Sequence, residues 1–152
     1  MNLEEKLANY GPGPWVDEVD ELFWRIPEVD LACCILRGPL GTWCGYVGLD
    51  SSHPYYKKGW AVVTEKIMVH GGVTFASTFS SPPLPATIKN LWWIGFDCGH
   101  FNDLVPGIVH LYPDLTINTN AIYKDTKYVI KETNSLAQQL KEIVPIPSNL
   151  VI

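Results

Sequence analysis

The spacing of hydrophobic and polar residues along the chain predicts both strands and helices. Continuous apolar runs, typical of buried strands, occupy residues 29–36 and 91–96. A further strand is expected over residues 42–49, and the turn at 37–41 predicts a hairpin between it and the strand before it. Residues 66–75 are expected to form a strand that two adjacent glycines interrupt, because such glycines indicate a bulge or the close approach of another group.

Helical spacing is found near both ends of the chain. Residues 2–9 predict a short helix, and residues 16–26 predict an amphipathic helix that Pro27 ends. Residues 60–64 fit either a short helix or a strand. Asp125 is a candidate N-cap for a final helix, whose apolar stripe is formed by Val129, Leu136, Leu140 and Ile143, with Thr133 at the remaining position.

The order of these segments predicts a single α+β domain over residues 1–152. We expect a mostly antiparallel sheet with a C-terminal amphipathic helix packed on one face. The expected parts are an N-terminal helical or irregular segment at 1–30, a sheet with its loops at 31–120, and the helix at 124–144. The stretches 50–59, 80–86 and 101–120 carry loop signals instead of regular periodicity.

Composition and charge narrow the classes of function. The 152 residues include 16 acidic residues against 11 Lys and Arg, a net charge of −5 without a basic stripe, which argues against binding to duplex nucleic acid. No apolar run approaches the roughly 18 residues of a membrane span, and the charged first ten residues lack the apolar segment of a signal peptide. We therefore expect a cytoplasmic protein without a membrane partner. The four cysteines form no Cys-x-x-Cys pair, so a structural zinc site is poorly supported.

Polar groups able to do chemistry follow the aromatic strand at 91–96. Asp97, His100 and Asp103 come directly after it, and His70 lies before the paired glycines. If these two segments are neighbours in the fold, the four side chains converge. Imidazole and carboxylate groups are ligands for zinc, manganese or iron, so a divalent metal held by all four side chains is one hypothesis.

Metal-free catalysis by the same groups is the alternative hypothesis. His70 and His100 can move protons at neutral pH with Asp97 as the orienting carboxylate, and two histidines could cut a phosphodiester as base and acid. A thiolate at Cys98, activated by His100, is a further candidate. In the purely structural interpretation Asp97 caps a turn, His70 bonds the backbone and Cys98 fills space.

A ligand pocket is the third candidate feature. A nucleotide-like ligand would need ring faces, backbone donors and a few cations, and the paired glycines offer N–H groups for anionic oxygens. Burial in the core is the alternative for at least half of the aromatic residues. The candidate ligand-binding residues are Trp43, Tyr46, His53, Tyr56, Trp60, Gly71, Gly72 and Thr74.

Several motifs together resemble a family of small proteins from tailed phages and prophages. They are His-Gly-Gly-Val-Thr-Phe at 70–75, Trp-Trp-Ile-Gly-Phe-Asp-Cys-Gly-His at 92–100 with Asp103, and Tyr-Lys-Asp at 123–125, which leads into Tyr-Val at 128–129 and Leu-Ala-Gln-Gln-Leu at 136–140. The resemblance covers residues 42–140. It implies an origin and a compartment, the cytoplasm of an infected or lysogenic bacterial host, and it does not imply a reaction.

A phage accessory protein of this size suggests counter-defence, in which an immune-signalling nucleotide is destroyed or trapped. We expect hydrolysis of a nucleotide-like anionic small molecule, with His70, Asp97 and His100 as catalytic groups. Non-catalytic sequestration of such a nucleotide is the first alternative. Inhibition of a host defence protein through an exposed Trp92 or Trp93 is the second. A homo-oligomer with pockets shared between subunits is also expected.

Overall fold

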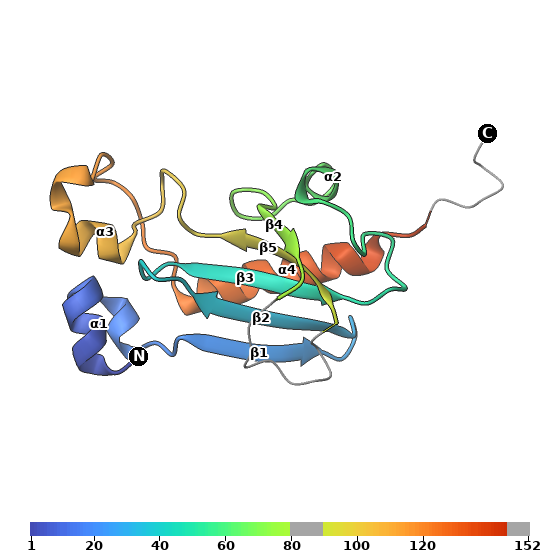
Figure 1. The fold of residues 1–152 in the computed structure, drawn as a ribbon, viewed down its shortest axis with the longest axis horizontal. Helices are drawn as coiled ribbons and strands as arrows, with labels where there is room; N and C mark the ends of the chain where they lie inside the picture. The colour runs from blue at the N-terminus through green and yellow to red at the C-terminus, as the bar shows by residue number, and fades with distance from the viewer. Residues whose placement is uncertain (80–89, 146–152) are drawn as a thin grey trace.

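The computed structural model describes residues 1–79 and 90–145, which form one sheet with helices at its face and at one end (Figure 1). The five strands lie in the order β1-β2-β3-β5-β4, and every neighbouring pair is antiparallel. The expected α+β class with an antiparallel sheet is therefore confirmed. The strand bounds are β1 Glu21–Ile26, β2 Leu31–Arg37, β3 Trp43–Leu49, β4 Phe75–Ser77 and β5 Trp92–Asp97.

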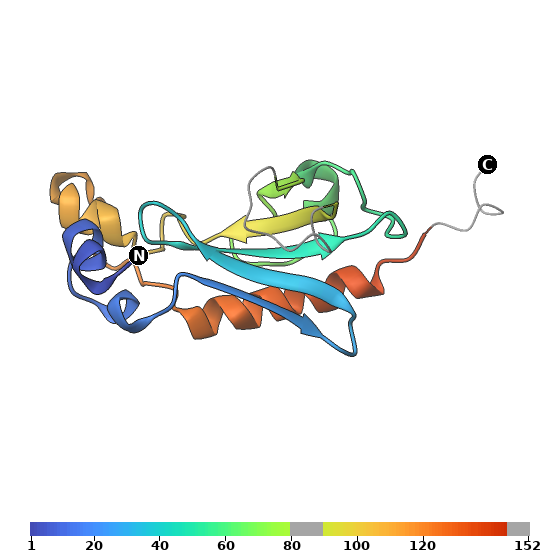
Figure 2. The ribbon, with the colours of Figure 1, turned by 60° about the horizontal axis from the view of Figure 1, so that its bottom comes forward.

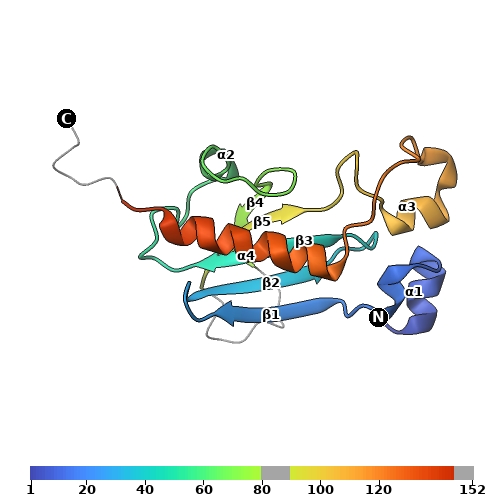
Figure 3. The same cartoon turned by 180° about the vertical axis from the view of Figure 1, so that it is seen from behind.

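The helices lie in three places around the sheet, and the short helix α2 is beside β4 (Figure 1). Helices α1 and α3 contact each other at one end of the sheet, whereas α4 runs across one face (Figure 3). None of the helices in the two described stretches is long and apolar enough to cross a membrane. The helix bounds are α1 Leu3–Tyr10, α2 Trp60–Thr64, α3 Pro106–Leu111 and α4 Thr126–Glu142, with 3-10 helices η1 at Pro14–Asp17 and η3 at Pro113–Leu115.

The final helix follows its sequence signals closely. The Asp125 side chain accepts a hydrogen bond from the Tyr128 N–H and so caps α4 as expected. The predicted stripe faces the sheet, where Val129, Leu136 and Leu140 are fully buried. Figure 2 shows α4 lying under the sheet, with β1 and β2 crossing it. The helix and the sheet thus form two layers around one core.

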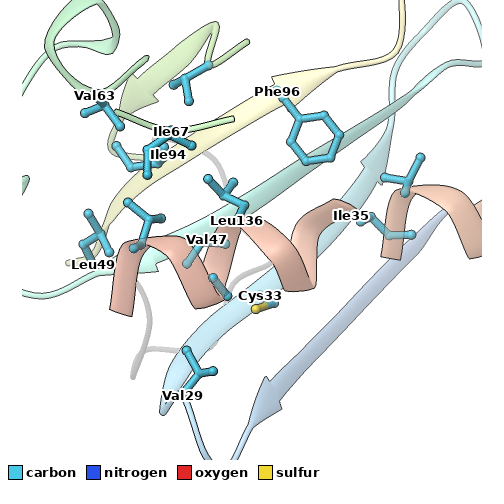
Figure 4. Close-up of a cluster of buried hydrophobic side chains, with 14 of the residues drawn as sticks. Val29, Cys33, Ile35, Val47, Leu49, Val63, Ile67, Ile94, Phe96 and Leu136 are labelled. Atoms are coloured by element: carbon cyan, nitrogen blue, oxygen red, sulfur yellow. The ribbon is translucent and has the colours of Figure 1, made fainter. Parts of the chain in front are cut away.

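The core between the two layers is built from alternate residues of the strands (Figure 4). Ile35 of β2 and Val47 of β3 are fully buried there together with Leu136 of α4. The helix packs tightly against β3 at Gly45, where an added Cβ would lie 2.4 Å from Thr133 Oγ1. Thr133 donates this hydroxyl to the Val129 carbonyl at 2.7 Å, so a polar residue satisfies its hydrogen bond within the stripe.

The prediction of a helix over residues 16–26 is wrong, because β1 occupies most of that segment. Leu22 and Trp24 alternate on the face that packs toward the α4 core, which is a period of two. Strand pairing with β2 and the hydrogen bond from Trp24 Nε1 to Asn134 Oδ1, 2.8 Å, fix the segment in the sheet. Tertiary pairing therefore overrides a spacing that also fits a short helix.

Two other predictions need correction. Residues 66–74 form turns and irregular structure, so the broken strand expected at 66–75 is reduced to β4. The stretch 101–120, expected to be irregular, contains α3 and η3. Residues 60–64 form a helix, which resolves the ambiguity left by their sequence. The loop expected at 80–86 lies outside the described residues.

A buried ion network ties the N-terminal segment to the start of α4. We define this N-terminal ion network as Lys6, Glu18, Asp20, Arg37, Tyr123 and Thr126. The Arg37 side chain is 2% exposed, and its five N–H groups donate to Asp20, Glu18, Tyr123 and two backbone carbonyls. Glu18 also accepts from the backbone N–H and the hydroxyl of Thr126, both at 2.7 Å.

Candidate functional site

Three segments that are distant in the sequence meet beside the end of β5. They are the turn at 69–74, the loop that follows β5, and the first turn of α4. Their polar side chains form what we call the histidine cluster, which consists of His70, Asp97, His100, Asp103 and Tyr128. The ring centroids of His70 and His100 are 5.9 Å apart, so the predicted meeting of the two imidazoles occurs.

Asp103 is the central acceptor of the cluster, and its side chain is completely buried. Its Oδ2 accepts hydrogen bonds from His70 Nε2 at 2.8 Å and from the His100 backbone N–H at 3.0 Å. Lys124 Nζ lies 3.1 Å from Oδ1 as an ion pair, although no group donates a well-aligned hydrogen bond to that oxygen. Burial alone would raise the pKa of Asp103, but these contacts outweigh it and lower the pKa below its ordinary value.

The bond to Asp103 determines where His70 carries its proton. An ionised carboxylate can only accept hydrogen bonds, so Nε2 of a neutral His70 holds the hydrogen and Nδ1 is left as an acceptor. Nδ1 lies 2.8 Å from the Tyr128 hydroxyl, which therefore donates to it. The result is a chain from a carboxylate to an imidazole to a hydroxyl, the arrangement that prepares a hydroxyl to lose its proton.

Tyr128 is the member of the cluster that is not among the predicted site residues. Burial, followed by the electrostatic effect of the acidic groups of Glu132, Cys98 and Asp103, raises the pKa of Tyr128, so its hydroxyl is protonated at rest. The side chain is half-buried, and its ring packs edge-on against His70 with centroids 5.4 Å apart. Tyr128 belongs to the motif at 123–129 and lies one turn into a capped helix, but neither signal distinguishes it from an ordinary surface tyrosine.

His100 differs from His70, both of whose ring nitrogens have partners, because one ring nitrogen of His100 is buried without a hydrogen bond. That atom, Nε2, lies 3.5 Å from Asp97 Oδ1, and it faces Gly71 so closely that a Cβ on Gly71 would come within 2.1 Å of it. The His100 side chain is 38% exposed. The ring is therefore held at its Nε2 edge, while its other edge can meet a ligand.

Asp97 has the structural role of capping a turn, which is the alternative given for it from the sequence. Its Oδ1 accepts from the Thr74 hydroxyl at 2.9 Å, and its Oδ2 accepts from the Gly99 N–H at 3.1 Å. Asp97 thus closes the turn after β5 and joins it to the segment before β4. Asp103, not Asp97, is the carboxylate that orients His70.

The predicted metal ligands do not form one coordination set. In the described parts of the chain, no three His, Cys, Asp or Glu side chains are arranged to hold a metal ion. Both ring nitrogens of His70 already have partners, and Asp97 faces Thr74 and Gly99. His70 would have to release Tyr128 or Asp103 to bind a metal.

The predicted ligand-binding residues are scattered across the fold. Trp43 is fully buried, and Tyr46 packs edge-on against Phe75 on the sheet face opposite α4, so neither presents a free ring face there. His53 accepts from the Tyr55 N–H and contacts the Leu140 carbonyl, far from the cluster. Trp60 is 54% exposed on α2. These residues do not form the single pocket that the sequence analysis expected.

The paired glycines have a backbone role that does not involve anion binding. Gly71 and Gly72 have φ values of 69° and 81°, in the left-handed region that favours glycine. The Gly72 N–H donates to the Val69 carbonyl at 2.8 Å, which leaves it unavailable to a phosphate. The glycines therefore turn the chain and let the His100 ring approach the backbone.

Cys98, Trp92 and Trp93 are three further candidate residues from the sequence, and they differ in how accessible the structure leaves them. Burial raises the pKa of Cys98, which is 2% exposed, so a reactive thiolate is disfavoured. Trp93 is fully buried, and half-buried Trp92 donates its indole N–H to the Lys58 carbonyl at 2.9 Å. Trp93 therefore offers no exposed side chain to a partner protein, whereas part of the Trp92 side chain stays accessible.

A hollow with a volume of about 380 Å³ adjoins the cluster on the far side of Asp103. It lies between α3, η3 and residues 116–121, and we call it the α3 hollow. Its walls are mainly apolar, with Leu104, Val105 and Ile108 among them, and Asp103 belongs to its lining. The sequence does not indicate this hollow, because residues 101–120 show no regular periodicity.

Comparisons with protein-family profiles, with curated protein sequences and with solved structures found no significant match to this chain. The fold and the site together define an α+β protein that carries a carboxylate–imidazole–tyrosine chain beside an apolar hollow.

Proposed function

We propose that this protein is a metal-independent hydrolase that cleaves a phosphodiester in a nucleotide-like small molecule. The observation that carries the proposal is the chain from Asp103 through His70 to Tyr128, with both hydrogen bonds at 2.8 Å. A carboxylate that orients an imidazole, which in turn accepts from a hydroxyl, is the arrangement by which many enzymes activate a nucleophile.

In the first step Tyr128 Oη attacks phosphorus while its proton moves to His70 Nδ1. The new bond joins Oη to phosphorus, and the bond from phosphorus to the leaving oxygen breaks. His100 donates a proton to that oxygen, since its ring is partly exposed and Asp97 lies beside it. Lys124 supplies positive charge near the reacting phosphoryl group, with Nζ 5.8 Å from the Tyr128 ring centroid.

In the second step water attacks phosphorus and releases Oη, which takes back its proton from His70. His100 accepts the proton that the water loses, so both histidines return to their starting states. His70 then neither gains nor loses a proton over the cycle, and the products are those of simple hydrolysis. Hydrolysis of an immune-signalling nucleotide by a phage protein is the biological setting that we propose for this reaction.

The proposal is tested with bis(p-nitrophenyl) phosphate and with a panel of linear and cyclic nucleotides, assayed in EDTA by chromatography. We expect the unchanged protein to hydrolyse at least one of these substrates. His100→Ala and Tyr128→Phe should each lower the rate of turnover by at least about 100-fold, the usual range for removing an acid–base group. His110→Gln, which changes an exposed histidine outside the cluster, should leave turnover unchanged. A phosphoryl-linked adduct on Tyr128 should be detectable by mass spectrometry.

The same assay distinguishes hydrolysis from sequestration. If the protein is heated after incubation and intact nucleotide is released, the ligand was bound and not cleaved. Intact recovery across the whole panel, or full turnover by Tyr128→Phe, would contradict the proposed reaction.

A further inference from the structure

Strand β1 forms one edge of the sheet, and no strand in residues 1–79 and 90–145 pairs with its outer side. It is the first strand in the order β1-β2-β3-β5-β4, so only one of its sides has a neighbour (Figure 1). Proteins usually protect such edges with Pro, Lys or a bulge, because an unprotected edge pairs readily with another strand. β1 contains no Pro or Lys, and its register with β2 is unbroken over residues 21–26. The edge is therefore suited to pairing with an added strand.

The register with β2 determines which backbone groups of β1 point outward. In an antiparallel pair, every second residue exchanges its N–H and C=O with the residue opposite. The Arg37 N–H donates to the Asp20 carbonyl at 2.9 Å, next to the start of β1, and Asp20 continues the register opposite Arg37. The even-numbered residues of β1 therefore bond to β2. Its odd-numbered residues, Glu21, Phe23 and Arg25, direct their N–H and C=O groups away from the sheet.

The same three residues expose their side chains on the face opposite α4. Phe23 is 40% exposed, and the Arg25 side chain is 50% exposed. The ion pair of Arg25 with Asp30, at 3.2 Å, is also exposed, so a further carboxylate can approach the guanidinium. Glu21 and Arg25 carry opposite charges and lie two positions to either side of Phe23. A second β1 that runs antiparallel and is centred on Phe23 would therefore place each Glu21 opposite Arg25 of the other copy.

We propose that this edge binds a second copy of the chain, and that β1 pairs with β1 in the register centred on Phe23. This register pairs every outward N–H and C=O of Glu21, Phe23 and Arg25. On the other face it sets Leu22 opposite Trp24 of the second copy. A centre at residue 21 or 25 would bring like charges together, and a centre at 22 or 24 would place one charged residue beyond the end of the partner strand. The pair is isologous, so both copies make the same contacts.

The pairing goes beyond the proposed hydrolysis. In the sheet, β2 and β3 separate β1 from β5, beside whose end the histidine cluster lies. Each copy therefore keeps its complete cluster, and the dimer joins two sheets without sharing a site between them. It differs in this from the pockets shared between subunits that are expected from the sequence.

The test measures the mass of the protein in solution by sedimentation equilibrium over a concentration series, in a reducing buffer at low ionic strength. We expect a reversible equilibrium between the chain of 17.0 kDa and a particle of twice that mass. Glu21→Arg and Arg25→Glu each bring like charges together across the dimer, so each should raise the dissociation constant at least about tenfold. Glu65→Arg and Lys66→Glu make the same charge changes at exposed residues away from β1 and should leave the dissociation constant unchanged.

A mixture of the two β1 variants gives the sharpest result. One variant carries two positive charges on this edge and the other carries two negative charges, so both contacts of the mixed pair are attractive although neither variant pairs well with itself. With one variant fluorescently labelled, sedimentation velocity should show a mixed dimer at least as stable as that of the unchanged protein. Because unfolded chains could not restore the pairing, this recovery also shows that the single variants are folded. A protein that stays monomeric throughout the series, a dimer that Arg25→Glu does not weaken, or a mixture without a mixed dimer would overturn the inference.

Discussion

Two networks of polar side chains lie at the start of α4, and they differ in how many of their polar atoms form hydrogen bonds. In the N-terminal ion network, Arg37 has all five N–H groups bonded, and both oxygens of Glu18 accept hydrogen bonds. In the histidine cluster, His100 Nε2 has no hydrogen bond, and Asp103 Oδ1 has only its ion pair with Lys124. Paired networks stabilise a fold, whereas unpaired polar groups cost stability and are kept where a ligand or a reaction uses them.

The two networks draw on neighbouring residues of one short segment. Tyr123 and Thr126 contact Glu18, while Lys124 and Tyr128 contact Asp103 and His70. Two tyrosines five positions apart therefore serve different networks. Tyr123 donates to a carboxylate that is already bonded to arginine, and Tyr128 donates to a free imidazole nitrogen. The comparison predicts that damage to the first network lowers stability, and that damage to the second lowers activity.

The largest expected effect on stability comes from Arg37→Met. The substitution leaves Glu18 and Asp20 without their main cation in a largely buried setting, so we expect the free energy of unfolding to fall by about 3–5 kcal/mol. Urea unfolding followed by circular dichroism measures the change. Arg37→Lys keeps the charge with fewer donors and should have a smaller effect. A loss below about 0.5 kcal/mol for Arg37→Met would show that the network contributes little.

A smaller effect is expected for Gly71→Ala, which acts on the cluster. The left-handed φ of 69° and the approach of the His100 ring both oppose a Cβ, so we expect a loss of about 1–3 kcal/mol and a displaced imidazole. Urea unfolding gives the stability, and the NMR signals of His100 report the displacement. Gly59→Ala is the matched control, because a Cβ there meets nothing within 4 Å. Equal effects of the two substitutions would contradict a special role for Gly71.

The smallest effect in this series is the acid sensitivity of the ion network. Burial alone would raise the pKa of Glu18, but hydrogen bonds from Thr126, Tyr123 and Arg37 outweigh it and lower the pKa below the ordinary 4.5. A carboxyl group with a lowered folded-state pKa stabilises the protein fully above its unfolded pKa. This contribution is lost as the pH falls from about 4.5 through the folded-state pKa.

Urea unfolding between pH 7 and pH 3 measures that loss, with Glu18→Gln as the comparison. The variant cannot titrate at this position, so its stability should fall less steeply below pH 4.5 than that of the unchanged protein. Parallel acid profiles for the two proteins would contradict the assignment of Glu18.

The sequence predicted the parts of the fold that local pattern determines. The terminal helix, its Asp125 cap and the strand at 91–96 were confirmed, because periodicity, capping and an apolar run are local signals. β1 was mistaken for a helix because its spacing fits both periods, and only pairing with β2 decides between them. The short helix α3 was missed because its six residues are too few to establish a period.

Local signals in the sequence predict the histidines of the site but not the roles of the groups around them. The meeting of His70 with His100 followed from two polar segments at the ends of apolar ones, and the structure brings these two rings together. The roles of Asp103 and Tyr128 depend on distances across three segments, which no spacing in the sequence encodes. Sequence alone does not separate Trp43 and Tyr46 from ligand-binding residues, because aromatic side chains occur both in cores and in pockets.

The most direct test compares one substitution made in each network, Tyr123→Phe and Tyr128→Phe. Each removes a single hydroxyl, and the two variants are assayed for urea unfolding and for turnover of the phosphodiester panel. Tyr123→Phe should lower the free energy of unfolding by about 1–3 kcal/mol, because it leaves half-buried Glu18 short of a donor, and it should leave turnover intact. Tyr128→Phe should change stability by less than about 1 kcal/mol and lower turnover at least about 100-fold. Equal turnover in the two variants, or a loss confined to Tyr123→Phe, would contradict the account.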